Sequence, residues 1–255
     1  MYRILWNGQS AMNANQNRLD IISNNIANMS TNGYKKVDIS FKDLMIESLE
    51  RKGYPTNNKD AFTGTGVKST EIGRDKSQSI LLSTGMSTDF GLDGEGMFKV
   101  IDRNGDIFYT RDGSFQVDIS GNIVNSRGDK LFVEYKAGYE GTKFDARNII
   151  IDQQGNISMR TSEGKAIEIA RIPLYSAVGD EAFSSVGTNL FKVVEGVNVY
   201  EVFNTSIYQG TVEGSNVDVG EEFADMIMTQ RAFQLGSKSV NIADEMWGMV
   251  NDLKR

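Results

Sequence analysis

Acidic side chains beside glycine are the residues of this sequence best placed to do chemistry. The chain has 255 residues, with 34 Asp and Glu but no His and no Cys. Thiol nucleophiles, serine–histidine triads and Cys/His metal sites are therefore excluded, because their essential side chains are missing. A pair of carboxylates, as in glycosidases, is the common hydrolytic arrangement that remains. Glu95 in LDGEGMF and Asp112 in YTRDGSF are the candidates for such a pair.

The surroundings of these two carboxylates favour turns over an active site. Both residues stand beside glycine in turn contexts, and no aromatic-lined cleft is indicated around either of them. The glycine-rich stretches DGEGMF and GTGVK complete no phosphate-binding loop. We therefore expect no catalytic residue, no cofactor and no enzymatic activity.

A short repeat of Asp and Gly resembles a calcium loop only at first sight. The pattern Asp-x-x-Gly-[Asp/Asn]-Ile occurs at residues 102–107, 118–123 and 152–157. Gly stands too early in the first copy for a calcium loop, and Gly113 stands where such loops carry a bidentate Glu. Asp at the first turn position with Gly at positive φ is instead typical of β-hairpins. The repeat therefore predicts hairpin turns and no metal site.

These turns lie in a middle region that reads as β structure. The short runs MFKVI, DIFYT, SFQVDI, LFVEY, IEIARIPLY and NLFKVV follow one another between about residues 70 and 210. Turn residues separate them, which is typical of an antiparallel β domain. Residues 50–70 lack a sustained apolar pattern and indicate an extended connector.

The two ends of the chain have the spacing of amphipathic helices, with apolar residues at every seventh position. The N-terminal series is Leu5, Met12, Leu19 and Ile26, and the C-terminal series is Met226, Phe233, Val240 and Trp247. We expect the first helix to cover about residues 4–32, with Gly33 as the left-handed residue past its end. Asp218 is expected to cap the start of the last helix.

Neither helix can bury its apolar stripe alone, so we expect the two to pair. The fold class that follows is α+β, with paired N- and C-terminal helices as a coiled-coil-like stem and a central antiparallel all-β domain. The expected divisions are a terminal helical assembly domain (1–36 and 213–255), a connector (37–70) and a β-rich domain (71–212).

A cluster of amides accompanies the N-terminal apolar stripe. Asn24, Asn25 and Asn28 crowd its last turns, although asparagine is a poor residue for a helix interior. An uncharged amide face can form directional hydrogen bonds with a neighbour after losing water. We therefore expect these amides to face other copies of the chain. The apolar residues Leu19, Ile22 and Ile26 are expected to pack around Phe233, Val240 and Trp247.

The residues expected to serve helix pairing and subunit assembly are thus spread over both ends of the chain. They are Leu5, Met12, Leu19, Ile22, Asn24, Asn25, Ile26, Asn28, Gly33, Tyr34, Met226, Phe233, Val240 and Trp247.

Charge and hydropathy argue against nucleic acid and membrane as partners. The net charge is −7, and no basic cluster exceeds the pair Lys35–Lys36, so we expect no binding to nucleic acid. No apolar run approaches the ~18 residues of a membrane-spanning helix. The N-terminal residues do not show the basic and apolar regions of a standard secretory signal.

Three collinear segments resemble one known family. ISNNIANMSTNGYKK resembles the signature of bacterial flagellar rod and hook proteins. LDGEGMFKV with YTRDGSFQVDISGNIV is similar to their β segment, and VEGSNVDVGEEFADMIMTQRAFQLGSKSV to their C-terminal helix. The stretches MYRILWNGQSAM, STNGYKK and TRDGSFQVD look most like the distal rod branch, with the proximal rod and hook branches second. The connector after LMIESL looks shorter than the distal pattern implies.

The resemblance implies a structural subunit of the flagellar basal-body rod. Such subunits stack through their terminal helices into a hollow helical tube that transmits torque to the hook. The implied partners are further copies of the chain, other rod and hook proteins, and the export apparatus that releases subunits from the cytosol. A β-domain module that binds cell-wall glycan remains the alternative. That alternative needs exposed aromatics, whereas Phe98, Phe108, Tyr109 and Phe115 alternate like core residues.

Overall fold

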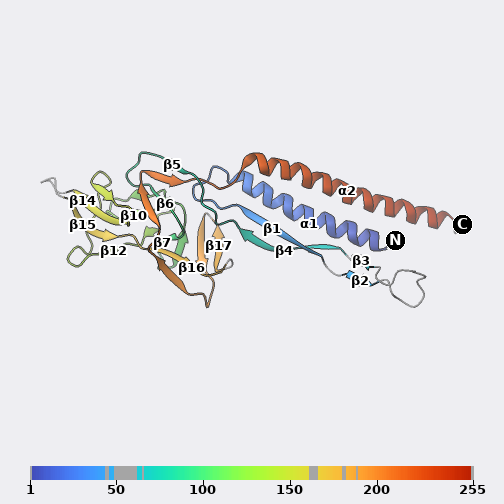
Figure 1. The fold of residues 1–255 in the computed structure, drawn as a ribbon, viewed down its shortest axis with the longest axis horizontal. Helices are drawn as coiled ribbons and strands as arrows, with labels where there is room; N and C mark the ends of the chain where they lie inside the picture. The colour runs from blue at the N-terminus through green and yellow to red at the C-terminus, as the bar shows by residue number, and fades with distance from the viewer. Residues whose placement is uncertain are drawn as a thin grey trace. The chain divides into compact units, whose positions relative to one another are not determined.

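The structure is a computed structural model that describes residues 2–43, 46–48, 62–64, 66–160, 166–179, 182–187 and 189–253. The chain divides into two compact units. Unit 1 comprises Met1–Ala27, Val37–Asp75 and Val217–Arg255, and unit 2 comprises Asn28–Lys36 and Lys76–Asn216. Two helices and many antiparallel strands make the class α+β, as the sequence predicts (Figure 1). An extended connector was expected over residues 50–70. Of these, residues 50–61 and 65 lie outside the described residues, and residues 62–64 and 67–70 belong to strands.

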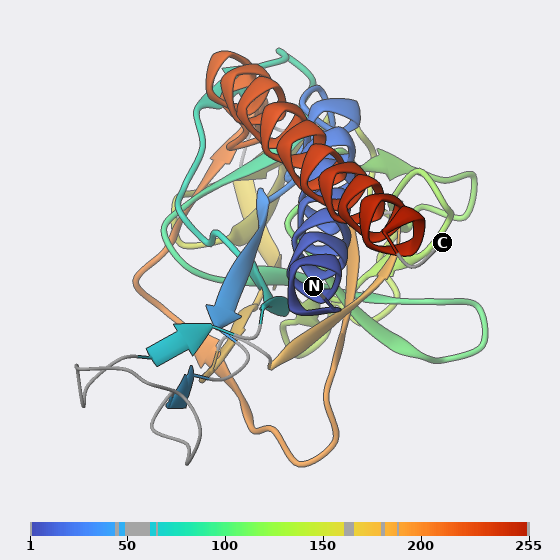
Figure 2. The ribbon, with the colours of Figure 1, turned by 90° about the vertical axis from the view of Figure 1, so that its right-hand side faces the viewer.

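Unit 1 contains both helices and two pairs of strands. Its elements are α1 (Tyr2–Ala27), β1 (Val37–Asp43), β2 (Ile46–Ser48), β3 (Phe62–Gly64), β4 (Val67–Arg74) and α2 (Val219–Asp252). β1 pairs antiparallel with β4, and β2 pairs antiparallel with β3. α1 contacts α2 as well as β1 and β4. Figures 1 and 2 show α1 lying between α2 and the β1–β4 pair.

The helix ends differ in how well the sequence predicts them. Asp218 caps α2 as expected, because its carboxylate accepts hydrogen bonds from the N–H groups of Gly220 (2.8 Å) and Glu221 (3.0 Å). The expected end of the first helix near residue 32 is wrong, since α1 ends at Ala27. A turn replaces the last residues, in which the N–H of Thr31 donates to the carbonyl of Asn28 at 3.1 Å.

Unit 2 is a β structure with two larger sheets and two further strand pairs. One sheet has the order β17-β18-β8-β7-β11-β10-β9, with β16 pairing to both β7 and β19, and the other has the order β12-β15-β14-β13. β20 pairs with β6, and β21 pairs with β5. The strands are β5 (Leu81–Ser83), β6 (Phe90–Asp93), β7 (Met97–Ile101), β8 (Ile107–Thr110), β9 (Gln116–Val117), β10 (Ile123–Val124), β11 (Lys130–Leu131), β12 (Glu134–Tyr135), β13 (Ile149–Ile151), β14 (Asn156–Arg160), β15 (Ala166–Arg171), β16 (Leu174–Ala177), β17 (Phe183–Gly187), β18 (Leu190–Val193), β19 (Val199–Val202), β20 (Ser206–Gln209) and β21 (Thr211–Glu213).

An aromatic cluster lies at the centre of the core of unit 2. Phe115 stacks against Phe90 at a centroid distance of 5.7 Å and meets Phe98 edge-on at 5.3 Å. All three rings are buried, and Tyr109 is buried as well. The alternation in β7 and β8 therefore marks core residues, as the sequence indicates.

The three predicted hairpin turns are confirmed. In each, the glycine N–H donates to the carbonyl of the leading Asp at 3.0 Å, as at Gly105 and Asp102. The three glycines have positive φ, between 82° and 88°. A fourth turn of the same design runs from Asn125 to Asp129 and joins β10 to β11. In the part of the chain that the structure describes, no three acidic side chains gather where a metal ion could be held.

Candidate assembly site on the terminal helices

The two helices of unit 1 approach closely where two glycines meet. A Cβ atom added to Gly8 of α1 would lie 2.8 Å from Cγ2 of Val240 on α2. A Cβ atom added to Gly236 would lie 3.0 Å from Cγ of Met12. Both distances are shorter than ordinary contacts between carbon atoms. Glycine at these two positions therefore sets how near the helix axes can come.

Four contacts fix the direction of the pair as antiparallel. Gly8 lies at Val240 and Met12 at Gly236. Further along, Nη2 of Arg18 is 2.9 Å from Oδ2 of Asp225, and Nδ2 of Asn25 is 3.3 Å from Oε2 of Glu222. The residue numbers on α2 fall as those on α1 rise.

This register corrects the expected partners of the apolar residues. Ile22 lies between Arg18 and Asn25, so it runs beside the segment of α2 between Glu222 and Asp225, far from Val240. Val240 instead lies against Gly8. The sequence pattern identifies which stripes meet, but not their alignment, because a seven-residue repeat fits its partner equally well after a shift of seven.

The burial of the expected helix-pairing residues follows the contact face. Ile22 is buried and Trp247 is exposed, and the remaining apolar members are half-buried: Leu5, Met12, Leu19, Ile26, Met226, Phe233 and Val240. Small residues of α2 share this face. Thr229 and Ala243 are buried, and together with Gly236 they are spaced seven residues apart. The apolar pattern of the sequence identifies Ala243 but not Thr229 and Gly236. We call the face formed by Met226, Thr229, Phe233, Gly236, Val240 and Ala243 the inner seam.

A polar stripe on α1 binds the β1–β4 pair. Nδ2 of Asn17 donates to Oγ of Ser69 at 2.9 Å, and Oγ of Ser10 accepts the backbone N–H of Val67 at 3.4 Å. Arg18 also lies over the ring of Phe41, with 5.8 Å between Cζ and the ring centroid. These contacts explain why α1 carries polar side chains on a face that is not fully solvated.

The expectation that Asn25 faces another subunit is wrong. Its side chain is only 1% exposed. Nδ2 donates to the carbonyl of Val37 at 2.9 Å, and Oδ1 accepts the N–H of Val37 at 3.0 Å. An amide is suited to this role because it carries a donor and an acceptor side by side. Asn25 therefore fixes the start of β1 on α1.

The two neighbouring amides have different surroundings. Oδ1 of Asn28 accepts a hydrogen bond from Oγ1 of Thr31 at 3.3 Å, so this side chain belongs to the turn after α1. Asn24 lies on the exposed surface of α1. Neither Asn24 nor Asn28 is buried, so both positions still fit a contact with another molecule.

Residues 32–36, which we call the anchor segment, belong to unit 2. Gly33 has φ of +67°, the left-handed conformation expected for it, and its N–H donates to the carbonyl of Glu213 at 2.7 Å. A Cβ atom at Gly33 would lie 2.6 Å from the carbonyl carbon of Arg111. Tyr34 is buried beside it, and its carbonyl accepts the N–H of Asn216 at 3.3 Å. The positive φ of residue 33 and the lack of room for a Cβ atom there therefore both require glycine at this position.

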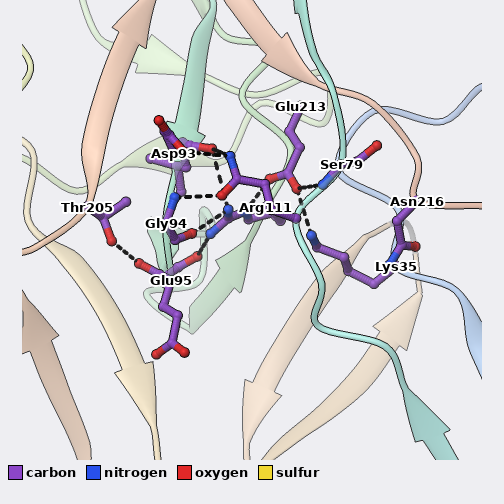
Figure 3. Close-up of polar contacts among 12 residues, drawn as sticks. Lys35, Ser79, Asp93, Gly94, Glu95, Arg111, Thr205, Glu213 and Asn216 are labelled. Carbon is purple, nitrogen blue, oxygen red and sulfur yellow. Dashed lines mark hydrogen bonds and ion pairs between the residues drawn. The ribbon is translucent and has the colours of Figure 1, made fainter.

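The buried carboxylate of Glu213 binds Lys35 of the anchor segment (Figure 3). Oε1 of Glu213 accepts from Nζ of Lys35 at 2.7 Å and from the N–H of Ser79 at 2.9 Å, and Oε2 pairs with Nε of Arg111. Arg111 also donates to the carbonyls of Gly94 and Gly96. Burial by itself would raise the pKa of Glu213, but the charge of Arg111 and the donated hydrogen bonds outweigh it and hold this pKa below its ordinary value.

The two candidate carboxylates, Glu95 and Asp112, have different surroundings. Glu95 is exposed and points away from the Glu213 cluster in Figure 3. Asp112 accepts the N–H of Ser114 at 3.0 Å within a turn. Burial, with a smaller effect from the charge of Asp89, raises the pKa of Asp112.

The described residues contain no helix long and apolar enough to cross a membrane.

Comparison with known proteins finds three family models in order along the chain. Residues 5–35 match the flagella basal body rod protein model, residues 91–159 the flagellar hook protein FlgE/F/G D1 domain, and residues 208–253 the flagellar basal body rod FlgEFG protein C-terminal model. A Borreliella burgdorferi protein named flagellar basal-body rod protein FlgG is 32% identical, with all of both chains covered. Proteins of the same name from Buchnera aphidicola, with 34% identity over 98% of each chain, and from Bacillus subtilis, with 32% identity over all of both chains, are also similar.

Proposed function

The chain belongs to the flagellar basal-body rod protein family, and on this premise we propose that it self-assembles through its terminal helices into a hollow tube. It is a structural subunit of the rod and its place is the flagellar basal body. The proposed tube transmits torque to the hook. Copies of the chain, other rod and hook proteins and the flagellar export apparatus are its proposed partners.

The observation that carries this proposal is the composition of the helix surfaces in unit 1. α1 is covered on one side by α2 and on another by β1 and β4. α2 contacts α1 but leaves several large apolar side chains exposed, including Phe223, Ile227 and Leu235. Exposed apolar side chains in a row mark a surface that binds another protein. In this proposal the stem formed by α1 and α2 is coiled-coil-like, and residues 1–36 and 213–255 act as the assembly domain.

The proposed position in the rod is the distal part. The relatives' printed name and the stretches MYRILWNGQSAM, STNGYKK and TRDGSFQVD support it. The residues proposed for assembly are the fourteen predicted from sequence, with Asn25 reassigned to the support of β1. The other proposed divisions are the connector (37–70), from which β1 and the first part of β4 pack on α1, and the β-rich domain (71–212).

The glycan-binding alternative needs exposed aromatic rings on the β-rich domain. Phe98, Tyr109 and Phe115 are buried and Phe108 is half-buried, so these four offer no open ring face to a sugar. Phe203 and Tyr200 are exposed, and it is family membership that favours the rod subunit over a glycan-binding module. Family membership also supports a structural role over a catalytic one.

Hydrogen exchange before and after assembly tests the proposal. The full chain is compared as a dilute monomer and as sedimented particles. Amides of α2 are expected to gain protection on assembly, while amides of the unit 2 core keep theirs. Particles in which only unit 2 gains protection would contradict assembly through the helices.

A further inference from the structure

Three asparagines of this chain, Asn7, Asn32 and Asn104, are followed directly by glycine. Asparagine loses its side-chain amide most readily before glycine, because glycine has no Cβ atom to keep its nitrogen away from the asparagine side chain. The glycine nitrogen bonds to Cγ of the asparagine, the bond from Cγ to Nδ2 breaks, and ammonia leaves with the proton of the glycine N–H. Water then opens the five-membered succinimide ring to aspartate or isoaspartate.

The conformation around each glycine decides whether this ring can close. The glycine nitrogen must give up its hydrogen bond and come into contact with Cγ of the asparagine. A helix or a packed turn holds these two atoms in other positions. A folded chain therefore reacts during local opening, and the free energy of opening differs from one region of a protein to another.

The pair Asn7–Gly8 is held by a helix and by its neighbour. Both residues belong to α1, in which the backbone N–H groups are used in hydrogen bonds along the helix. Gly8 is also buried, and a Cβ atom there would lie 2.8 Å from Cγ2 of Val240 in the inner seam. Asn7 can therefore react only after α1 has left α2 and unwound.

The pair Asn32–Gly33 is held by three hydrogen bonds to other parts of unit 2. Nδ2 of Asn32 donates to Oγ of Ser114 at 2.9 Å, and its carbonyl accepts from Nδ2 of Asn189 at 2.7 Å. The N–H of Gly33 donates to the carbonyl of Glu213 at 2.7 Å. Both the leaving amide and the attacking nitrogen are thus bound, and their release requires the anchor segment to come away from unit 2.

The pair Asn104–Gly105 lies in the turn between β7 and β8. Both residues are exposed, and a Cβ atom at Gly105 would meet nothing within 4 Å. The N–H of Gly105 donates to the carbonyl of Asp102 at 3.0 Å, and Nδ2 of Asn104 donates to Oδ2 of Asp102 at 3.2 Å. These two bonds lie within the turn itself, so they can open while the strands on either side stay paired.

We infer that Asn104 is the residue at which the folded chain loses a side-chain amide, and that the products loosen the β7–β8 turn. An aspartate at this position cannot donate to Asp102 and places a second negative charge beside it. An isoaspartate adds one carbon atom to the backbone of the turn, next to the pairing of Ile101 with Ile107. The inference goes beyond the proposed function, since the reaction needs only one folded chain and water.

The experiment incubates the dilute full chain in mildly alkaline buffer and follows the three Asn-Gly peptides by mass spectrometry after digestion in acid. Conversion of the amide to an acid changes the peptide mass, and chromatography separates aspartate from isoaspartate. The same chain unfolded in guanidinium shows how fast each pair reacts without the fold. Asn104→Gln is the matched variant, because its longer side chain would have to close a six-membered ring.

Asn104 is expected to convert about tenfold faster than Asn7 and Asn32 in the folded chain, whereas the three rates agree within about threefold in guanidinium. The folded Asn104→Gln variant is expected to release much less ammonia than the original chain. Equal rates at the three sites of the folded chain would overturn the inference. So would an Asn104 that reacts in guanidinium but not in the folded chain, because the closed turn would then protect it.

Hydrogen exchange of fresh and incubated chains tests the effect of the products. Amides of residues 102–106 are expected to exchange faster once Asn104 has converted, while the amides of α1 stay as protected as before. Unchanged exchange in the turn after conversion would show that the products leave it intact, and would overturn that part of the inference.

Discussion

The side chain of Asn25 hydrogen-bonds both backbone polar groups of Val37. Oδ1 of Asn25 accepts the Val37 N–H at 3.0 Å, and Nδ2 donates to the Val37 carbonyl at 2.9 Å. Two residues from different elements thus form a pair that resembles one rung of a β-ladder. The rung ties the last turns of α1 to the first residue of β1.

Replacing Asn25 by Ala is expected to destabilise unit 1. The change leaves a buried N–H and a buried carbonyl of Val37 without partners, at a cost of about 1–3 kcal/mol for each group. Chemical denaturation of the full chain measures the loss. Asn24→Ala is the control, because Asn24 is exposed on the same helix. Equal stability of the two variants would contradict the structural role of Asn25.

The glycine contact between the helices predicts opposite effects for two glycine substitutions. Gly8→Val should push α1 from α2, because even one added carbon would meet Val240, and overpacking of this kind costs about 1–3 kcal/mol. Gly248→Ala adds a carbon where nothing lies within 4 Å. Alanine is the better helix former, so this second variant should be about 0.5–1 kcal/mol more stable. Thermal unfolding followed at 222 nm, the standard helix signal, compares them, and equal destabilisation by both would refute the close approach.

Gly33 predicts a difference between two glycines that share a positive φ. Gly33→Ala combines backbone strain with a clash against Arg111, whereas Gly105→Ala, at φ +88°, meets nothing within 4 Å. Strain alone costs about 1–2 kcal/mol, so Gly33→Ala should cost clearly more than Gly105→Ala. Denaturation of unit 2, followed by tyrosine fluorescence, gives both values. Similar costs would mean that the anchor segment is not packed against Arg111.

Glu213 predicts a loss of stability in acid. Its pKa in the folded chain lies below the ordinary 4.5, so its contribution is present above that pH and is lost as the pH falls through the lower folded value. Glu213→Gln should lower the unfolding free energy at pH 7 by about 3–5 kcal/mol, since two buried cations lose their counter-charge. The difference in unfolding free energy between the original chain and Glu213→Gln should become smaller toward pH 3.

Denaturation at several pH values provides the measurement. Asp106→Asn is the control, because Asp106 is an exposed carboxylate 3.9 Å from Lys192. Exposed pairs of this kind contribute about 0–1 kcal/mol. A gap between the original chain and Glu213→Gln that stays constant from pH 7 to pH 3 would exclude Glu213 as the group responsible.

The helices and hairpins of this protein could be predicted because short local sequence patterns indicate them. The seven-residue series at both ends and the Asp-x-x-Gly turns each depend on neighbours within a few residues. The fourth turn was missed because it begins with Asn125 and ends before Lys130, outside the consensus with Asp and Ile. A looser pattern, with Asn allowed at the first position, finds it.

The second covered face of α1 could not be predicted from the helix alone. A signal was present in the next segment, where Val37, Ile39 and Phe41 alternate as in a strand. Nothing local shows that this strand returns to the amides of α1. The burial of Lys35 was equally hidden, since lysine is usually exposed and its partner Glu213 lies 178 residues away.

The anchor segment also constrains the order in which the chain can mature. Its residues Asn32 to Lys36 are held by groups that are synthesised much later, among them Ser114, Asn189, Glu213 and Asn216. Because a ribosome synthesises the chain from its N-terminus, the anchor segment emerges long before these partner residues. Its hydrogen bonds and ion pair cannot all form until nearly the whole polypeptide has been made. The anchor segment is therefore expected to be among the last parts of the chain to become ordered, and to stay unfolded in a chain that is still incomplete.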